Sequence, residues 1–163
     1  MPLIKNGAIV HEDQWVYLTD DQDLADRDGA DAIIVSLTRW RRDRDALLAR
    51  DLGVRLRADQ SPALIAAHLP HIALVALEFP AFKDGRAFTY ARLLRERYGF
   101  SGEVRAVGNV LRDQFQFMVR CGFDAVEAEK ESDAEAWLPA SQESNVLYQP
   151  TGDRQPWVMT LRQ

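Results

Sequence analysis

The side chains of this chain that could do chemistry follow short apolar runs, at the points where a strand is expected to give way to a helix. They are the carboxylates of Glu78 and Asp84, and the cationic or amide side chains of Arg57, Lys83, Arg86, Asn109 and Arg112. Gly85 adds a backbone N–H to the same candidate site. The carboxyl ends of parallel strands meet at one edge of a sheet, where α/β folds place their ligands. We therefore expect these residues to share one edge, with the carboxylates as general acid or base and the others as anion ligands.

The loop Lys83-Asp84-Gly85-Arg86 is the densest of these groups. Its glycine permits a tight turn, the helix expected after it has unpaired N–H groups in its first turn, and Lys83 and Arg86 add positive charge. An oxyanion or a carboxylate would fit such a loop. An Asp-Gly turn before a helix is also common in plain connections, so an anion site and an ordinary loop both remain open here.

Each of the other candidates has a structural interpretation as well. Glu78 and Asp59 can accept N–H groups at a helix start or pair with Arg57. Arg112 can pair with Asp113 on the surface of a helix. A shared site is therefore indicated only by the whole set of residues coming together.

No sequence motif indicates a cofactor, a metal or a nucleophile. Neither Gly-x-Gly-x-x-Gly nor a Gly-Lys-Ser/Thr phosphate loop occurs, and no serine lies in a nucleophile elbow. Cys121 is the single cysteine, so an internal disulfide is impossible and the chain alone cannot hold an iron–sulfur cluster. His68 and His71 straddle Pro70, which keeps them off one regular helical face. We expect no cofactor and no bound metal.

Composition indicates one globular domain without a nucleic-acid or membrane partner. The 163 residues are 47% hydrophobic, and 20 Lys and Arg against 25 Asp and Glu give a net charge of −5, which disfavours binding to phosphates or anionic lipids. The longest apolar run, Ile72–Leu77, is too short for a membrane span, and no signal peptide is recognisable. We expect a cytoplasmic protein whose α/β domain covers residues 1–141, with a polar tail at 142–163 packed back on it.

Five short apolar runs predict buried strands, each followed by a segment with helical features. The runs are Ala32–Leu37, Val54–Ala58, Ile72–Leu77, Val104–Val107 and Ala125–Val126. This alternation is typical of an α/β domain with a mainly parallel sheet of about five strands. Strand order is not readable, so an open sheet and an incomplete (β/α) barrel are both compatible. Ahead of these runs, Gly7–Leu18 predicts a short hairpin or covering strand, and the acidic stretch Asp20–Asp31 a solvated connection.

Caps and stops outline the helices between these strands. Thr38 is expected to cap a helix that runs to about Asp51, with Gly53 as its stop. Ser61 should cap the next helix, and Asn109 the helix before the last strand. These positions fix where the polar loops at the sheet edge begin and end.

Three stretches, Leu77–Arg95, Gly108–Gln114 and Cys121–Asp124, resemble the bacterial domain-of-unknown-function family 934, and the likeness covers most of the chain. The resemblance implies a small protein described as an oxidoreductase of sulfite reduction, because its genes lie near those of assimilatory sulfate reduction. It assigns no catalytic residue. Six-electron reduction needs a redox cofactor, for which the sequence offers no motif.

The first functional hypothesis is therefore an accessory protein of assimilatory sulfate and sulfite reduction, in cysteine biosynthesis. It would bind a small anionic ligand or a partner, with sulfite reductase or another sulfur-assimilation protein as the expected partner. Binding is expected to use the polar loops: Lys83, Arg86, Asn109 and Arg112.

A second hypothesis is a small enzyme without a cofactor that acts on an anionic substrate. Glu78 or Asp84 would be its general acid or base, and Arg57 or Arg112 would hold the substrate. A third is a scaffold in which the same residues only cap helices and fix loops.

Overall fold

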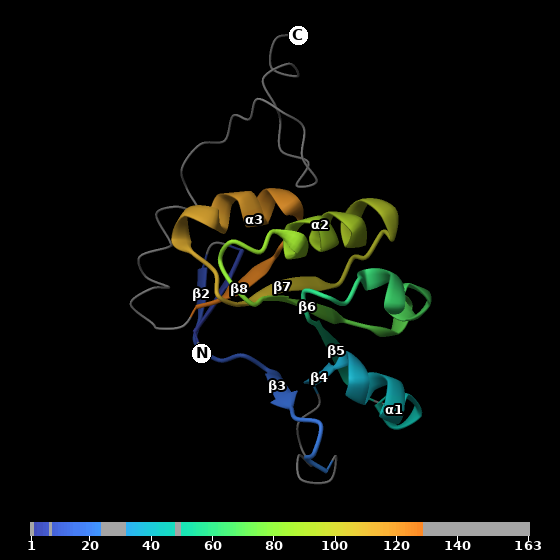
Figure 1. Cartoon of the computed structure of the whole chain (residues 1–163). Coiled ribbons are helices and arrows are strands. Elements are labelled where there is room, and N and C mark those ends of the chain that lie inside the picture. The colour runs from blue at the N-terminus through green and yellow to red at the C-terminus, as the bar shows by residue number, and fades with distance from the viewer. Residues whose placement is uncertain (1, 7, 24–31, 48–49, 129–163) are drawn as a thin grey trace.

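The computed structural model describes residues 2–6, 8–23, 32–47 and 50–128 as an α/β fold built on one eight-stranded sheet (Figure 1). The strands are β1 (Leu3–Lys5), β2 (Ala8–Val10), β3 (Trp15–Leu18), β4 (Ala32–Ser36), β5 (Asp51–Leu56), β6 (Leu74–Phe79), β7 (Glu103–Gly108) and β8 (Ala125–Glu127). Their order is β2-β1-β8-β7-β6-β5-β4-β3. Strands β3 to β8 run parallel, whereas β1 is antiparallel to both β2 and β8.

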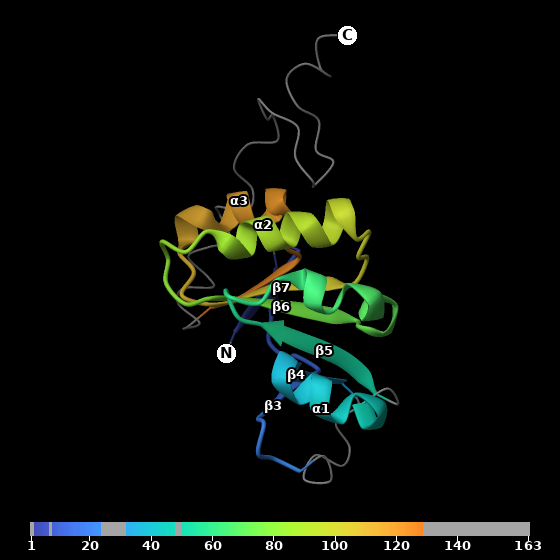
Figure 2. The ribbon, with the colours of Figure 1, turned by 45° about the vertical axis from the view of Figure 1, so that its right-hand side comes forward.

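Three helices cover one face of this sheet, as the turned view in Figure 2 shows. They are α1 (Leu37–Leu47), α2 (Arg86–Arg92) and α3 (Phe115–Cys121), and α2 continues into a π-helical turn over Leu93–Arg97. Short 3₁₀ turns cover Pro62–Leu64, Ala66–His71 and Arg112–Gln114. None of the helices in the described part of the chain has the length and apolar character that crossing a bilayer requires.

The predicted α/β class is confirmed, but the expected sheet, mainly parallel with about five strands, is wrong. The sheet is mixed, open and curled, and its additional strands come from the amino-terminal segment. The hairpin lies earlier than Gly7–Leu18, at Leu3–Val10, and Trp15–Leu18 instead forms a parallel edge strand beside β4. Strands of three or four residues are too short to show a clear alternation of polar and apolar residues, so the sequence pattern missed their pairing.

The helix predicted from Thr38 to Asp51 begins and ends elsewhere. It starts directly after Ser36, whose hydroxyl oxygen accepts the backbone N–H of Arg39 at 3.0 Å. The chain enters β5 at Asp51, so Gly53 lies inside a strand and does not end a helix. A side chain at Gly53 would crowd the neighbouring strands, with its Cβ only 2.8 Å from a side-chain carbon of β4.

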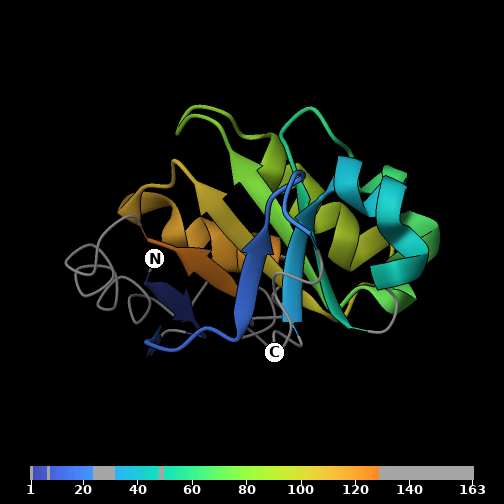
Figure 3. The same cartoon turned by 90° about the horizontal axis from the view of Figure 1, so that it is seen from below.

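Alternating strand residues divide between a helix-covered face and an open face. Ile33 and Val35 belong to the large core under the helices, whereas Ile34 belongs to a small cluster on the opposite face. In the described part of the chain no helix lies on that opposite face, which Figure 3 views directly. We call it the open face.

The sheet curls so strongly that side chains from distant strands meet on the open face. The Tyr17 hydroxyl on β3 donates to Glu127 Oε1 on β8 at 2.7 Å, although four strands lie between them in the sheet. Next to this contact Arg105 is completely buried and contacts three carboxylates, from Asp13, Glu103 and Glu127. Burying a guanidinium requires such partners, and we expect removal of the guanidinium from this ionic cluster to weaken the curl.

The predictions for the carboxyl-terminal tail at 142–163, and for the domain boundary at 141, lie outside the described residues. The same is true of residues 24–31 in the acidic stretch. Its first residues, Asp20–Asp23, are described and lie against α1.

Candidate functional site

The loops after β6 and β7 lie side by side at the carboxyl edge of the sheet. Gly108, the last residue of β7, has a φ of +93°, and a Cβ there would lie 2.6 Å from the carbonyl oxygen of Phe79. Glycine is therefore required at this position. It lets the next backbone N–H, that of Asn109, donate to the same Phe79 oxygen at 2.8 Å.

Two side-chain amides hold these loops together. Asn109 donates through Nδ2 to the carbonyl oxygen of Pro80 at 2.9 Å. Gln114 donates through Nε2 to the carbonyl oxygen of Phe82 at 2.9 Å, while its Oε1 accepts the backbone N–H of Leu111 at 3.3 Å. Asn109 thus braces the loops instead of capping the following helix, and Gln114 organises that helix start. A glutamine directly before Phe115 gave no signal of this role in the sequence.

The predicted catalytic carboxylate Glu78 is engaged in an ion pair. It lies at the end of β6 with its Oε2 at 3.1 Å from the guanidinium of Arg55 on β5, and its side chain is 23% exposed. Arg57, the residue after the end of β5, contacts Asp59 at 2.9 Å on the surface. Both cations near Glu78 therefore already have carboxylate partners.

Asp84 and Arg86 pair with each other inside their own loop. The Arg86 guanidinium contacts the Asp84 carboxylate at 2.5 Å, and the Arg86 backbone N–H donates to it at 3.2 Å. These hydrogen bonds lower the pKa of Asp84 to about 2, the side-chain one contributing most. Asp84 therefore stays ionised at neutral pH and is a poor general acid or base. Gly85 has an ordinary φ of −85°, and a Cβ there would meet its nearest atom, on Phe88, at 3.9 Å.

Several predicted site residues do lie near one another at this edge of the sheet, but the cations Arg57 and Arg86 are each paired with a carboxylate. The hydrogen bond from Arg57 lowers the pKa of Asp59, and the positive charge of Arg86 adds to that lowering. The field of Glu78 likewise contributes to raising the pKa of Arg57. Solvent screens surface pairs of this kind, and their arrangement alone does not indicate catalysis.

Apolar and cationic side chains are exposed on the two loops that Asn109 and Gln114 hold together. Phe82 is 50% exposed and Leu111 is 43% exposed. Lys83 and Arg112, also exposed, follow these two residues directly in sequence, and the Lys83 Nζ lies 5.9 Å from the centre of the Phe82 ring. We call Phe82, Lys83, Leu111 and Arg112 the loop surface. Because Gln114 contacts the backbones of both Phe82 and Leu111, the two halves of this surface are fixed to each other.

A further exposed aromatic ring lies on α3, beyond the loops. Phe117 is 48% exposed, and its ring centre lies 4.9 Å from that of Phe88 on α2. Phe88 in turn contacts the buried Phe79 ring at 5.1 Å. The apolar surface near the start of α2 is therefore continuous with the core.

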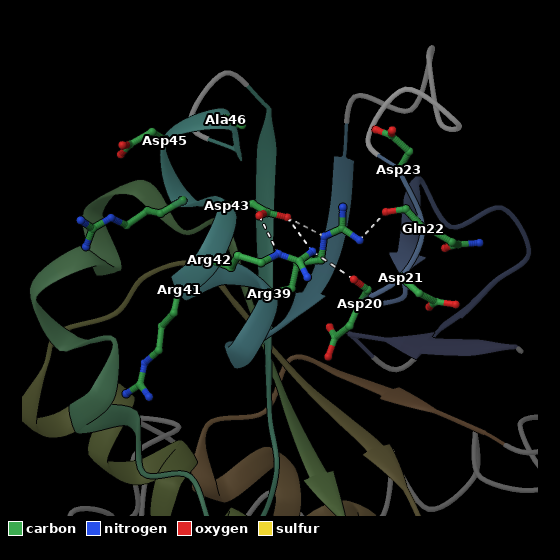
Figure 4. A pocket seen from close by; sticks show the side chains of 11 residues that line it. Asp20, Asp21, Gln22, Asp23, Arg39, Arg41, Arg42, Asp43, Asp45 and Ala46 are labelled. Atoms are coloured by element: carbon green, nitrogen blue, oxygen red, sulfur yellow. Dashed lines mark hydrogen bonds and ion pairs between the residues drawn. The ribbon is translucent and has the colours of Figure 1, made fainter.

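A separate hollow of about 770 Å³ lies beside the start of α1, lined by Asp20–Asp23 and the outer residues of α1 (Figure 4). Its charged groups are mostly engaged with one another. Arg39 is 3% exposed and donates to two backbone oxygens in residues 19–22, while Arg42 and Asp43 pair at 2.8 Å. The hollow is thus an ionic contact that holds the acidic segment on the helix.

Sequence reasoning missed the residues of the open face and half of the loop surface. Arg55 and Arg105 each lie between two apolar residues of a strand, a pattern that signals a charged residue on the second face of a sheet. Phe82 and Leu111 stand beside the predicted motifs, but neither was among the predicted site residues. Among the described residues no three His, Cys, Asp or Glu side chains are grouped as a metal site.

The comparisons identify the family and leave the activity open. The family model for "Bacterial protein of unknown function (DUF934)" matches residues 53–158, which include both loops of the loop surface. A search of the curated proteins finds no significant match.

Proposed function

The chain belongs to the DUF934 family. We propose that it is an accessory protein of assimilatory sulfite reduction, the role that the resemblance implies, and that it acts by binding the reductase or another protein of sulfur assimilation. The observation that supports binding is the loop surface, where Phe82 is 50% exposed and Leu111 is 43% exposed on loops braced by Gln114. Fixed, exposed apolar side chains at a loop edge are typical of a protein contact.

The same edge gives less support to acid–base catalysis. Glu78 lies 3.1 Å from Arg55, and the pKa of Asp84 is lowered to about 2 by Arg86. A general acid or base works best with a pKa near the working pH. An enzyme acting through Asp84 would have to break its pair with Arg86 first.

A small anion as the main ligand is also less well supported than a protein. Arg57 and Arg86, two of the cations expected to hold an anion, lie 2.9 Å and 2.5 Å from the carboxylates of Asp59 and Asp84. Those carboxylates would repel a second anion. Lys83 and Arg112 remain, and they are interleaved with apolar side chains that a small oxyanion cannot use.

The test is growth of a strain that lacks this protein on sulfate, sulfite or sulfide as the only sulfur source. We expect failure on sulfate and sulfite with rescue by sulfide, because the defect would lie at the reduction step. The wild-type gene and the Glu78→Gln and Asp84→Asn variants should all restore growth, since neither carboxylate is assigned a catalytic role.

Two results would count against the proposal. Normal growth of the deletion strain on all three sources would separate the protein from sulfite reduction. Failure of a Glu78→Gln variant that folds and accumulates normally would favour the enzyme hypothesis, since an accessory role has no need of that carboxylate.

A further inference from the structure

We infer that the loop surface, Phe82, Lys83, Leu111 and Arg112, docks against an acidic patch with an apolar centre on the partner protein. This inference rests on the proposed function, because it names the chemistry of the partner at the same site. It goes beyond that function by assigning the contact residues and the charge of the surface that they recognise.

The apolar part of the loop surface is exposed, and its backbone is held by side-chain hydrogen bonds. Phe82 and Leu111 are 50% and 43% exposed. The amide of Gln114 bonds both of their backbones, and Asn109 bonds the carbonyl oxygen of Pro80 at 2.9 Å. A surface that is already organised loses little conformational freedom on binding, so more of its contact energy appears as affinity.

The charge of the loop surface is opposite to that of the whole chain. Its two cations, Lys83 and Arg112, have no carboxylate within ion-pair distance among the described residues, whereas the nearby Arg86 is neutralised by Asp84. The chain as a whole has a net charge of −5. A positive patch on a negative protein orients an acidic partner toward that patch and repels it elsewhere.

The spacing of apolar and cationic residues favours a protein over a small oxyanion. Each loop contributes one apolar residue followed directly by one cation, Phe82-Lys83 and Leu111-Arg112. A protein surface can bury the apolar residues and place carboxylates opposite the cations in one contact. An oxyanion would use the cations alone and leave the exposed ring in water.

The experiment measures binding of the full chain to purified sulfite reductase from the same organism by calorimetric titration at low and high salt. The charge variant reverses Lys83 and Arg112 to Glu, and the apolar variant is Leu111→Ser. The matched controls are Arg41→Glu, an exposed cation on α1, and Leu64→Ser, whose side chain is 43% exposed like that of Leu111.

We expect each loop-surface variant to bind at least tenfold more weakly than wild type and both controls to bind like wild type. Raising the salt concentration should weaken wild-type binding and have less effect on the charge variant, because its attraction is already lost. Far-UV circular dichroism and thermal unfolding of each variant check that it folds.

Other outcomes distinguish a failure of the loop-surface inference from a failure of the proposed function. If wild type binds and folded loop-surface variants bind equally well, this inference is wrong while the proposed function stands. If wild type does not bind the reductase, the proposed function loses its named partner and the inference falls with it. If the loop-surface variants abolish a concentration-dependent dimer of the chain instead, the occupant is a second copy, which contradicts an acidic partner protein. If inorganic sulfite binds wild type and the charge variant loses that binding, the surface is an anion site and the inference is again wrong.

Discussion

Replacing Arg105 by Met should strongly destabilise the fold, because the ionic cluster on the open face depends on this guanidinium. Arg105 is fully buried and contacts the carboxylates of Glu103 at 2.8 Å and Glu127 at 3.2 Å. Burial lowers its pKa, but the carboxylates outweigh that effect and raise the pKa above its ordinary value, so the group is charged throughout the accessible pH range. Methionine fills a similar space without charge. Glu103 then keeps its contact with Lys5 and Glu127 its hydrogen bond from the Tyr17 hydroxyl, but both lose the buried guanidinium.

The size of the effect follows from burial. The side chains of Glu103 and Glu127 are only 8% and 7% exposed, so they cannot regain full hydration when their partner is removed. Breaking a buried ion pair by removing one member costs about 3–5 kcal/mol. At about 2–4 °C per kcal/mol for a chain of this size, the melting temperature should fall by roughly 6–20 °C.

Urea unfolding followed by tryptophan fluorescence measures this loss, with Arg57→Met as the matched control. Arg57 also pairs with a carboxylate, but both side chains are exposed, at 64% and 59%. The free energy of unfolding of this control should therefore fall far less than that of Arg105→Met, because solvent screens the exposed pair. The reasoning is refuted if Arg105→Met lowers the free energy of unfolding by no more than Arg57→Met does, with the same dependence on urea concentration. The ionic cluster would then not stabilise the curl.

Three further predictions concern the backbone and protonation. Gly108→Ala should lower the free energy of unfolding by about 1–2 kcal/mol because of its φ of +93°, and by more because the new Cβ would lie 2.6 Å from the Phe79 carbonyl oxygen. Gly85→Ala should be tolerated, and equal urea midpoints of the two variants would contradict this. Burial raises the pKa of Tyr17 above its ordinary 10.0, and the negative charge of Glu127 raises it further. The folded state therefore keeps a proton that the unfolded chain releases. Stability should therefore fall above pH 10 by up to about 1.4 kcal/mol per unit, and this component should vanish in Tyr17→Phe. The carboxyl carbon of Asp84 should titrate by NMR near pH 2, so its pairing stabilises the fold above pH 3.8 and is lost as the pH falls toward 2; Arg86→Gln should move that pKa up toward 3.8, and an unchanged value would assign the shift to another cause.

Hydrophobic pattern was sufficient to predict the central strands and the edge where the polar loops lie. The runs that became β4, β5, β6 and β7 are long enough for apolar content to identify them, and their parallel alternation with helices gave the α/β class. The amino-terminal strands were not predictable in this way. Their pairing with β4 and β8 depends on contacts distant in sequence, such as the one between Tyr17 and Glu127.

The sequence placed the polar loops at one edge of the sheet, but it could not show how their side chains pair. Residue types alone cannot show that Asp84 is engaged by Arg86, two residues away, or that Glu78 faces Arg55 on the next strand. Nor can they show that an apolar residue such as Phe82 stays exposed, because exposure depends on how far a loop extends beyond the sheet. These three facts turn a predicted anion site into a surface suited to protein contact.

The most direct test of that account is hydrogen–deuterium exchange of the chain alone and with purified sulfite reductase. The account predicts that backbone amides in the two loops, residues 80–86 and 109–114, exchange more slowly in the complex, while residues 15–18 of β3 and the segment 20–23 do not change. Protection confined to the open face or to residues 20–23, with none in the two loops, would contradict the assignment of the loop surface as the site of binding.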